Sequence, residues 1–308
     1  MRAMVGTFQQ SEEFFAAARE MGWPVQRSRA ACGTAWTETV RRVPALGRLR
    51  LVSGAPAPGP WLDAAQTRPG TLLVNADAAA GWRQAGFWPL LTPSVAARLT
   101  LGPEPEMRAR MEQKWRNRLN AARQAEVTTR LRVFPADPSH WLLAAEAAQA
   151  RARGYRGWPP ALGAAWAAAN PGAARLVTAM HGTETLAAAL ILLHGDSATW
   201  QIGVSTRAGR QRNAMNAVLW RAMRWCAGRG FARLDLGTLD SAHAPGLARF
   251  KLGTGAAACK LGGTWLHHPL SAPLARRLPA RLAWPDEADT APRGGSRGAA
   301  RQCDRVSR

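Results

Sequence analysis

Long apolar runs and a secretory leader are both missing from this sequence. No stretch approaches the roughly 18 consecutive apolar residues that a membrane-spanning helix needs. The opening residues, MRAMVGTFQQSEEFF, contain no apolar core followed by a small-residue cleavage site. We therefore expect a protein without a transmembrane segment that stays in the cytoplasm.

Cysteine is scarce and dispersed. Cys32, Cys226, Cys259 and Cys303 are the four cysteines, and they form no C-x-x-C pair. Neither a zinc site nor a dithiol redox motif is predicted from this spacing, and the six histidines show no metal-ligand pattern either. We expect no bound metal. Cys226 falls on the apolar stripe of a predicted helix and is interpreted as a small buried hydrophobic residue.

Lysine is rare, although the chain is strongly basic. Lys114, Lys251 and Lys260 are the only lysines, while lysine and arginine together number 41 against 20 acidic residues, a net charge of +21. Dedicated nucleic-acid surfaces typically carry basic runs interleaved with aromatic residues. The arginines of this chain are dispersed and form no such runs. The charge permits tRNA or an anionic cofactor as a partner, but a solvated arginine-rich surface explains most of it.

The composition suits a globular protein with a substantial core. Hydrophobic residues make up 47% and charged residues 20% of the 308, and this length favours two domains. Ser11 predicts the cap of a first helix that ends near Gly22. The elements expected next are strands over 25–31, 33–43 and 47–52 in an antiparallel meander, a short helix from Trp61, a strand over 71–74, a helix over 78–84, and strands over 87–91 and 95–101.

A single long helix is predicted over 104–125. Met107, Met111, Leu119 and Ala122 lie on one face at helical spacing, and the segment separates two domain-sized halves. Its basic residues either contact an anionic substrate or form a solvated face, and we favour the solvated face. These residues are Lys114, Arg116 and Arg118.

The second half repeats the plan in fuller form. Residues 215–226 carry apolar side chains at helical spacing between two apolar stretches, with Gly237 ending the second. This pattern predicts a β-α-β crossover. The whole order is a strand over 128–134, helices over 137–153 and 160–169, strands over 176–181, 185–193 and 198–204, a loop, the crossover helix, a strand over 231–236, a short helix that carries Lys251, and strands over 256–261 and 264–268.

The loop of this crossover is a predicted anion site. It brings backbone N–H groups and a helix N-terminus to one place, and arginine side chains reinforce the positive potential. These are Arg207, Arg210 and Arg212.

Three partial motifs occur in a fixed order along the chain. The first is Lys114-Trp-Arg-Asn-x-Leu-x-x-Ala122, the second is Asp235-Leu-Gly237, and the third is Gly246-Leu-x-x-Phe-Lys-x-Gly-x-Gly255. With them, the chain from about Gln9 to His268 resembles the FemAB-like branch of the GNAT acyltransferase superfamily, including the BioF2-like group.

The resemblance implies a fold and a domain plan. The fold class is α/β (α+β), with two tandem GNAT-like (acyl-CoA N-acyltransferase) domains of mixed, mostly antiparallel sheets flanked by helices. The expected boundaries are a degenerate N-terminal domain over 1–103, a connecting helix over 104–126, a C-terminal catalytic domain over 127–284 and a disordered tail over 285–308. The tail is also indicated by its low apolar content.

The resemblance also implies site residues. In the superfamily, a loop of the type Arg/Gln-x-x-Gly-x-Gly/Ala holds the pyrophosphate of coenzyme A, and Asn213 stands where a glycine is expected. The residues matched to coenzyme A binding are Arg207, Gly209, Arg210, Arg212, Asn213 and Ala214.

Catalytic and acceptor-binding roles follow from the same resemblance. Lys251 is matched to electrostatic stabilisation of the reacting carbonyl, and its alternative is a surface lysine. Asp235 either takes the amine proton or anchors a loop, and we favour the anchor; Asp240 and His243 are weaker candidates for the base. The acceptor is assigned to the chain's single tyrosine and its neighbours, which could instead be loop packing. These are Tyr155, Arg156 and Trp158.

The expected activity is N-acyl transfer from acyl-CoA, used as a co-substrate, to an amine acceptor. The acceptor is a small molecule or a cell-envelope precursor. A first alternative is transfer from aminoacyl-tRNA to a cell-wall precursor, as in FemAB relatives that build peptidoglycan cross-bridges. A second alternative is a non-catalytic GNAT-fold binding protein. The oligomeric state is not predicted.

Overall fold

The computed structural model of the chain describes residues 7–44, 47–78 and 81–277. The chain divides into two compact units. Unit 1 comprises Met1–Phe15, Gly22–Val95 and Cys259–Arg308, and unit 2 comprises Ala16–Met21 and Ala96–Ala258. Each unit is built around its own sheet, and the expected α+β class with mixed sheets and flanking helices is confirmed.

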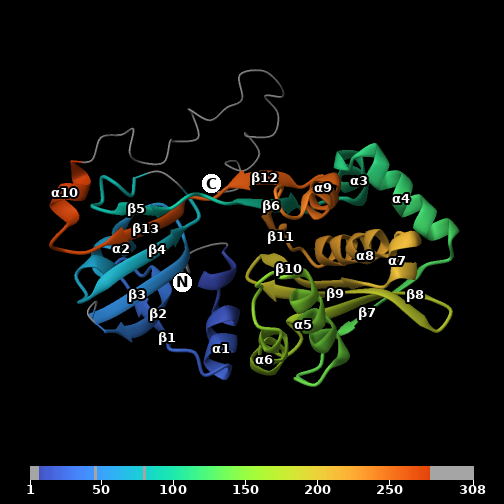
Figure 1. Ribbon diagram of the computed structural model, residues 1–308, viewed down its shortest axis with the longest axis horizontal. Coiled ribbons are helices and arrows are strands. Elements are labelled where there is room, and N and C mark those ends of the chain that lie inside the picture. The colour runs from blue at the N-terminus through green and yellow to red at the C-terminus, as the bar shows by residue number, and fades with distance from the viewer. Residues whose placement is uncertain (1–6, 45–46, 79–80, 278–308) are drawn as a thin grey trace, which may run out of the picture. The chain divides into compact units, whose positions relative to one another are not determined.

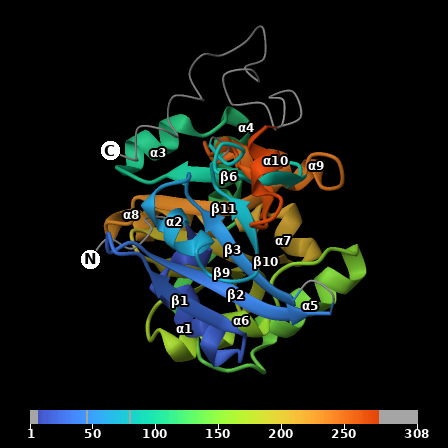
Figure 2. The same ribbon diagram turned by 90° about the vertical axis from the view of Figure 1, so that its left-hand side faces the viewer.

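Unit 1 contains a six-stranded sheet in the order β1-β2-β3-β4-β13-β5. Strands β1, β2 and β3 form the expected antiparallel meander (Figure 2), and β3 pairs in parallel with β4. The elements before and within this sheet are η1 (Phe8–Gln10), α1 (Glu12–Glu20), β1 (Val25–Arg29), β2 (Ala35–Val43), β3 (Gly47–Ala55), α2 (Pro60–Gln66), β4 (Thr71–Ala76), β5 (Trp88–Leu91), β13 (Gly263–His267) and α10 (Ala272–Arg276).

Aromatic residues fill the core of unit 1. Trp61 contacts Trp36 on one side and Trp82 on the other, and Trp82 contacts Phe87.

The sequence predicts a helix over 78–84, but residues 81–86 form turns. Gly81 and Gly86 adopt positive φ angles of 87° and 88° there, which interrupts a helix.

Unit 2 contains a seven-stranded sheet in the order β12-β6-β11-β10-β9-β8-β7. Helix α8 lies on one face and helices α5 and α6 on the other (Figure 1). Its elements are β6 (Val95–Thr100), α3 (Glu104–Arg110), α4 (Gln113–Gln124), β7 (Thr128–Val133), α5 (Trp141–Arg153), α6 (Ala161–Ala169), β8 (Ala174–His181), β9 (Glu184–His194), β10 (Ser197–Ser205), α7 (Arg207–Gln211), α8 (Ala214–Gly228), β11 (Arg233–Leu239), α9 (Pro245–Gly253) and β12 (Ala257–Lys260).

The predicted crossover is confirmed. Strands β10 and β11 pair in parallel and are connected through α8, whose apolar stripe from Val218 to Cys226 is buried. Cys226 is fully buried, and burial raises the pKa of its thiol to about 12. It is therefore the hydrophobic residue that the sequence indicated.

The predicted long helix over 104–125 is wrong. It is two helices, α3 and α4, separated by extended backbone at Met111 and Glu112. Met111 is buried in the core of unit 2. Arg116 donates to the carbonyl oxygen of Met111 at 2.6 Å, which satisfies an end of α3 that the helix itself leaves unpaired. Arg116 thus has a structural partner, while Lys114 and Arg118 are exposed.

The observed units differ from the expected domain boundaries. Strand β6, expected to end the first half, joins the second sheet, and β13, expected in the second half, pairs with β4 and β5 of the first. Strand exchange of this kind depends on long-range pairing, which leaves no local sequence signal. The expected tail over 285–308 lies outside the described residues.

The part of the chain that the structure describes contains neither a membrane-spanning helix nor a cluster of metal-binding side chains. No helix in residues 7–44, 47–78 and 81–277 is both long and apolar enough to cross a bilayer. Within the same ranges, no three His, Cys, Asp or Glu side chains gather as a metal-binding group.

Candidate functional site

Strands β10 and β11 separate toward their carboxyl ends. Their pairing covers three positions and ends where Thr199 meets Asp235, after which β10 continues to Ser205 and β11 to Leu239. A register irregularity between Trp200 and Ile202 accompanies the separation. Ligands of open α/β sheets bind beyond the carboxyl ends of parallel strands, so this edge of unit 2 is the candidate site.

Trp200 folds back along β10. Its indole nitrogen donates to the carbonyl oxygen of Ile202 at 2.7 Å, and its ring covers Gly203. A β-carbon at Gly203 would lie 2.4 Å from the Trp200 ring. Gly203 therefore has no room for a side chain, and its backbone stays accessible to a neighbouring helix.

Lys251 is buried at this edge. Its side chain extends from α9 and donates to the carbonyl oxygen of Thr238, in β11, at 2.8 Å; the residue is only 7% exposed. Burial lowers the pKa of Lys251, and the negative charge of Asp235 opposes that shift. The alternative of a surface lysine is wrong for this structure.

The motif around Lys251 packs against the motif in α4. Phe250 contacts Trp115 and Trp200, with ring centroids 6.0 and 6.2 Å apart. A β-carbon at Gly253 would lie 2.8 Å from the Trp115 ring, and the amide of Glu112 donates to the carbonyl oxygen of Gly253 at 3.0 Å. Two motifs far apart in sequence thus form one support that fixes α9 and Lys251.

The side chain of Asp235 anchors its own strand. Its Oδ1 accepts a hydrogen bond from the amide of Gly237 at 2.6 Å, and its Oδ2 lies 3.6 Å from Nε of Arg98. Gly237 was expected to end the strand but lies inside β11, with a φ of 80°. The Asp235 hydrogen bond holds this left-handed residue in the strand, which agrees with the anchoring interpretation.

Asp240 and His243 form a turn of their own. The amide of His243 donates to Asp240 Oδ1 at 2.8 Å. Hydrogen bonds from His243 and Ala242 lower the pKa of Asp240, and both residues are exposed. A carboxylate with a lowered pKa is a weak proton acceptor, so neither residue is favoured as the base.

The predicted anion loop is a short helix, α7, followed by one residue in a left-handed conformation. Thr206 caps α7 by accepting from the amide of Gly209 at 2.9 Å. The amides of Arg210, Arg212 and Asn213 donate to carbonyl oxygens within this segment. They are therefore already used, and the expectation of a cradle of loop amides is wrong at these three positions.

The remaining matched residues lie around the start of α8. Asn213 has a φ of 53°, the conformation for which glycine is preferred and asparagine tolerated, which explains how it replaces the expected glycine. Ala214 is the buried first residue of α8. Arg207 and Arg210 are exposed, and Arg210 donates to the carbonyl oxygen of Ser205 at 2.8 Å.

Gly209→Ala is expected to destabilise unit 2. A β-carbon there would lie 2.0 Å from the carbonyl oxygen of Leu186 in β9, so the α7 backbone must move. We expect the free energy of unfolding to fall by about 1–3 kcal/mol, the usual cost of overpacking. Urea denaturation measures this change. Gly228→Ala, where nothing lies within 4 Å, is the matched control. Equal stability of the two variants would contradict the close packing of α7 on β9.

Tyr155 belongs to a hydrogen-bonded cluster with two residues of α5. Its hydroxyl donates to Glu146 Oε1 at 2.7 Å. The side-chain amide of Gln149 lies 3.0 Å from the Tyr155 hydroxyl and 3.1 Å from the carbonyl oxygen of Gly203. The cluster is thereby tied to β10. Arg156 and Trp158 are exposed in the loop before α6.

Sequence reasoning missed Glu146 and Gln149. A signal was present, because they are the only polar residues in the run WLLAAEAAQA and their spacing of three places them on one helix face. Arg98 and Gly203 were also missed, since their roles depend on β6 and β10 lying near β11 and α5.

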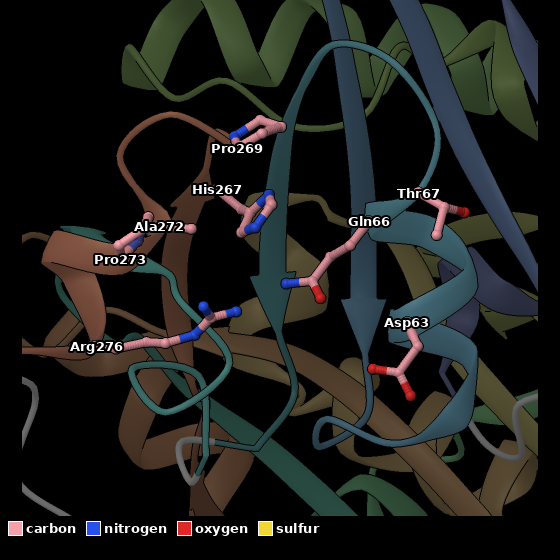
Figure 3. Close-up of a pocket in the computed structure, with 8 residues that line it drawn as sticks. All are labelled: Asp63, Gln66, Thr67, His267, Pro269, Ala272, Pro273 and Arg276. Carbon is pink, nitrogen blue, oxygen red and sulfur yellow. The ribbon is translucent and has the colours of Figure 1, made fainter.

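A separate cavity of about 340 Å³ lies in unit 1 (Figure 3). The side chains of Gln66, His267 and Arg276 point toward the same space. Burial lowers the pKa of His267, as do nearby positive charges. None of the residues matched to acyl transfer lines this cavity, and it is not the candidate site.

Residues 107–260, half of the chain, match a family described as an acetyltransferase (GNAT) domain. No curated protein sequence matches the chain.

Solved structures show the same fold. The crystal structure of FemX has a TM-score of 0.69 and 13% identity, covering 89% of this chain and 94% of that one. The C-terminal domain (DUF2156) of a putative lysylphosphatidylglycerol synthetase from Agrobacterium fabrum has a TM-score of 0.52 and 12% identity, covering 87% and 91%. L-PGS from Bacillus licheniformis has a TM-score of 0.50 and 13% identity, covering 88% and 96%. At these identities the likeness concerns the fold.

Proposed function

The chain belongs to the family of acetyltransferase (GNAT) domains, and from this premise we propose that it is an N-acyltransferase that moves an acyl group from acyl-CoA to an amine. Family membership and the FemX-like tandem architecture make the chain a GNAT-fold protein. The proposal adds the donor, the acceptor class and the residues that act.

The buried ammonium of Lys251 is the observation that carries this proposal. Amine attack on an acyl carbonyl places negative charge on the carbonyl oxygen, and a preorganised donor in a water-poor site stabilises that charge. Lys251 lies at the carboxyl end of β11, where the carbonyl oxygen of Thr238 fixes its ammonium and the neighbouring Phe250 packs on Trp200 of β10. The Thr238 carbonyl oxygen and the negative charge of Asp235 offset the cost of burying this ammonium, and an ammonium has three N–H donors, so two remain for an oxyanion.

The start of α8 is the proposed phosphate-binding end of the donor site. Its first-turn amides point along the helix axis, and a helix N-terminus favours an anion. Arg207, Arg210 and Arg212 precede this turn. Because β10 leads into α7 and runs parallel to β11, the start of α8 and Lys251 follow the same edge of the sheet.

Removing two of these arginines is expected to weaken coenzyme A binding. Arg210→Ala and Arg212→Ala should each raise the Kd for coenzyme A about tenfold, or ~1.4 kcal/mol, the scale of one charge-assisted contact. Isothermal titration calorimetry measures it. Arg221→Ala, at an exposed position about two turns after the start of α8, is the control with an expected change under twofold. Unchanged affinity in both Arg210 and Arg212 variants removes this role.

Aminoacyl-tRNA is the alternative donor, and one observation favours it. Helix α4 contains no acidic residue, and Lys114, Arg118 and Arg123 are exposed on it. Such a surface attracts a polyanion. In that case the acceptor amine belongs to a cell-wall precursor, as the FemAB resemblance implies.

Native mass spectrometry of the freshly purified protein distinguishes the two donors. Coenzyme A or acyl-CoA retained by the protein supports the proposed donor. Retained tRNA without coenzyme A overturns it in favour of the alternative.

A further inference from the structure

Acyl transfer to an amine needs a proton acceptor, and three carboxylates are candidates, one on β11, one in the turn after it and one on α5, which contacts β10. Asp235 holds the backbone amide of Gly237 and lies beside Arg98. Asp240 holds the amides of its own exposed turn. Both carboxylates are therefore committed to the backbone. The third is Glu146, in α5.

Glu146 is held by side chains alone. Tyr155 donates to its Oε1 at 2.7 Å, and Gln149 lies 3.2 Å from its Oε2. A carboxylate offers about four acceptor positions on its two oxygens, so each oxygen retains capacity for an incoming N–H. Tyr155 is 38% exposed, so this end of the cluster is reached from outside the fold.

Gln149 connects the cluster to β10. Its amide has two hydrogens but lies within hydrogen-bond distance of Glu146, the Tyr155 hydroxyl and the carbonyl oxygen of Gly203. Gly203 in turn lies under Trp200, whose ring contacts Phe250, the neighbour of Lys251. A continuous chain of contacts thus runs from Glu146 to the base of Lys251, within unit 2.

We propose that Glu146 accepts the proton of the acceptor amine, and that Tyr155 and Gln149 are the positioning residues that hold its carboxylate. This role rests on the proposed function. It also makes the acceptor a group that arrives as an ammonium ion, because the anionic carboxylate of Glu146, half-buried on α5, attracts a cation.

The step balances as follows. Glu146 removes one proton from the ammonium, directly or through a water molecule, and the freed nitrogen attacks the carbonyl carbon. A C–N bond forms, and the C–S bond of the thioester breaks. The second nitrogen proton is lost to solvent, and the thiolate of coenzyme A takes a proton from solvent. For an aminoacyl ester, the C–O bond breaks in the same way.

The surroundings tune Glu146 as a base. Burial raises the pKa of Glu146, against the lowering effect of hydrogen bonds from Tyr155 and Gln149 and of the positive charge of Arg153. A raised pKa lies closer to the operating pH, and a general base transfers protons most efficiently when its pKa is near that pH. Burial raises the pKa of Tyr155 to about 12, and the hydrogen bond to Glu146 is the next largest cause of that rise.

The test measures kcat/KM against pH for the full chain. Acetyl-CoA is the donor, a library of primary amines supplies the acceptors, and the released thiol of coenzyme A reports the reaction. The wild-type rate should rise as pH passes the pKa of Glu146, because the base must be deprotonated. Glu146→Gln should lower kcat/KM by 10²–10⁴-fold, the usual range for a general base, and remove that limb. Glu106→Gln, on the exposed face of α3, should stay within twofold.

Tyr155→Phe keeps the ring and tests positioning without removing the base. Loss of its hydrogen bond, which lowers the pKa of Glu146, should shift the rising limb to higher pH. A merely structural Tyr155 would change the rate without moving the limb, and would overturn the positioning role.

Two failures are distinguishable. Active wild-type protein with Glu146→Gln within threefold and an unchanged limb overturns the role of Glu146 alone, provided the variant binds coenzyme A as wild type does. If the variant does not fold, the Tyr155→Phe profile decides, with an unmoved limb counting against the proposal. Wild-type protein that transfers no acyl group from acetyl-CoA or aminoacyl-tRNA overturns the proposed function and this role with it.

Discussion

Lys251→Ala should lower the rate of acyl transfer on the order of 10²–10³-fold, the cost of removing one donor to a developing oxyanion. The reason is the position of its ammonium, buried beside β11 and fixed by the Thr238 carbonyl oxygen. The measurement is kcat with acetyl-CoA at saturation. Lys251→Met keeps most of the buried stem and should show the same loss, which separates charge from packing.

The pH profile provides a second readout of Lys251. Its charged form is the active one, and burial lowers its pKa. Activity should therefore fall as pH rises through a value below that of an ordinary lysine, and the variant should lack this falling limb. Lys114→Ala, at an exposed position of α4, is the control and should change the rate less than twofold. A loss under tenfold, or ~1.4 kcal/mol, in Lys251→Ala would leave the lysine without a catalytic role.

Trp115→Ala should cause the largest loss of stability. Its ring is 2% exposed, contacts Phe250 and fills the space left by Gly253. We expect the free energy of unfolding to fall by about 3–5 kcal/mol, as for other buried aromatic residues replaced by alanine. Urea denaturation of the full chain measures it, with the transition of unit 2 followed by hydrogen exchange in α9.

The partly exposed Trp158 supplies the control for that change. Trp158→Ala should lower the free energy of unfolding less than Trp115→Ala does, because Trp158 is 39% exposed and Trp115 only 2%, and it should leave hydrogen exchange in α9 unchanged. Amides of α9 that exchange as slowly in Trp115→Ala as in wild type would contradict the account in which α4 supports Lys251.

Local patterns were sufficient for most elements of unit 2. The apolar stripe of α8 and the turns on each side of β9 predicted the crossover and its neighbouring strands, because period and turn residues are local properties. Lys251 was singled out by its motif and is buried in the structure, while its catalytic role stays a prediction. The break at Met111 and the α7 helix were not predicted, because a side-chain cap from Arg116 and the packing of Gly209 on β9 decide them.

Contacts between distant segments were beyond the reach of the sequence. Glu146 is far from Lys251 in the chain, and the contacts that link α5 to α9 run through Gly203 and Trp200 of β10. The exchange of β6 and β13 between sheets is also non-local. Periodicity identifies a segment as a strand, but tertiary packing decides which strand it pairs with.

The most direct test of the central claim is a crystal structure of the full chain with coenzyme A bound. The account predicts the pyrophosphate at the first turn of α8 and the thiol between the ends of β10 and β11, in contact with the Lys251 ammonium. Coenzyme A bound elsewhere, or a thiol out of reach of Lys251, would contradict it.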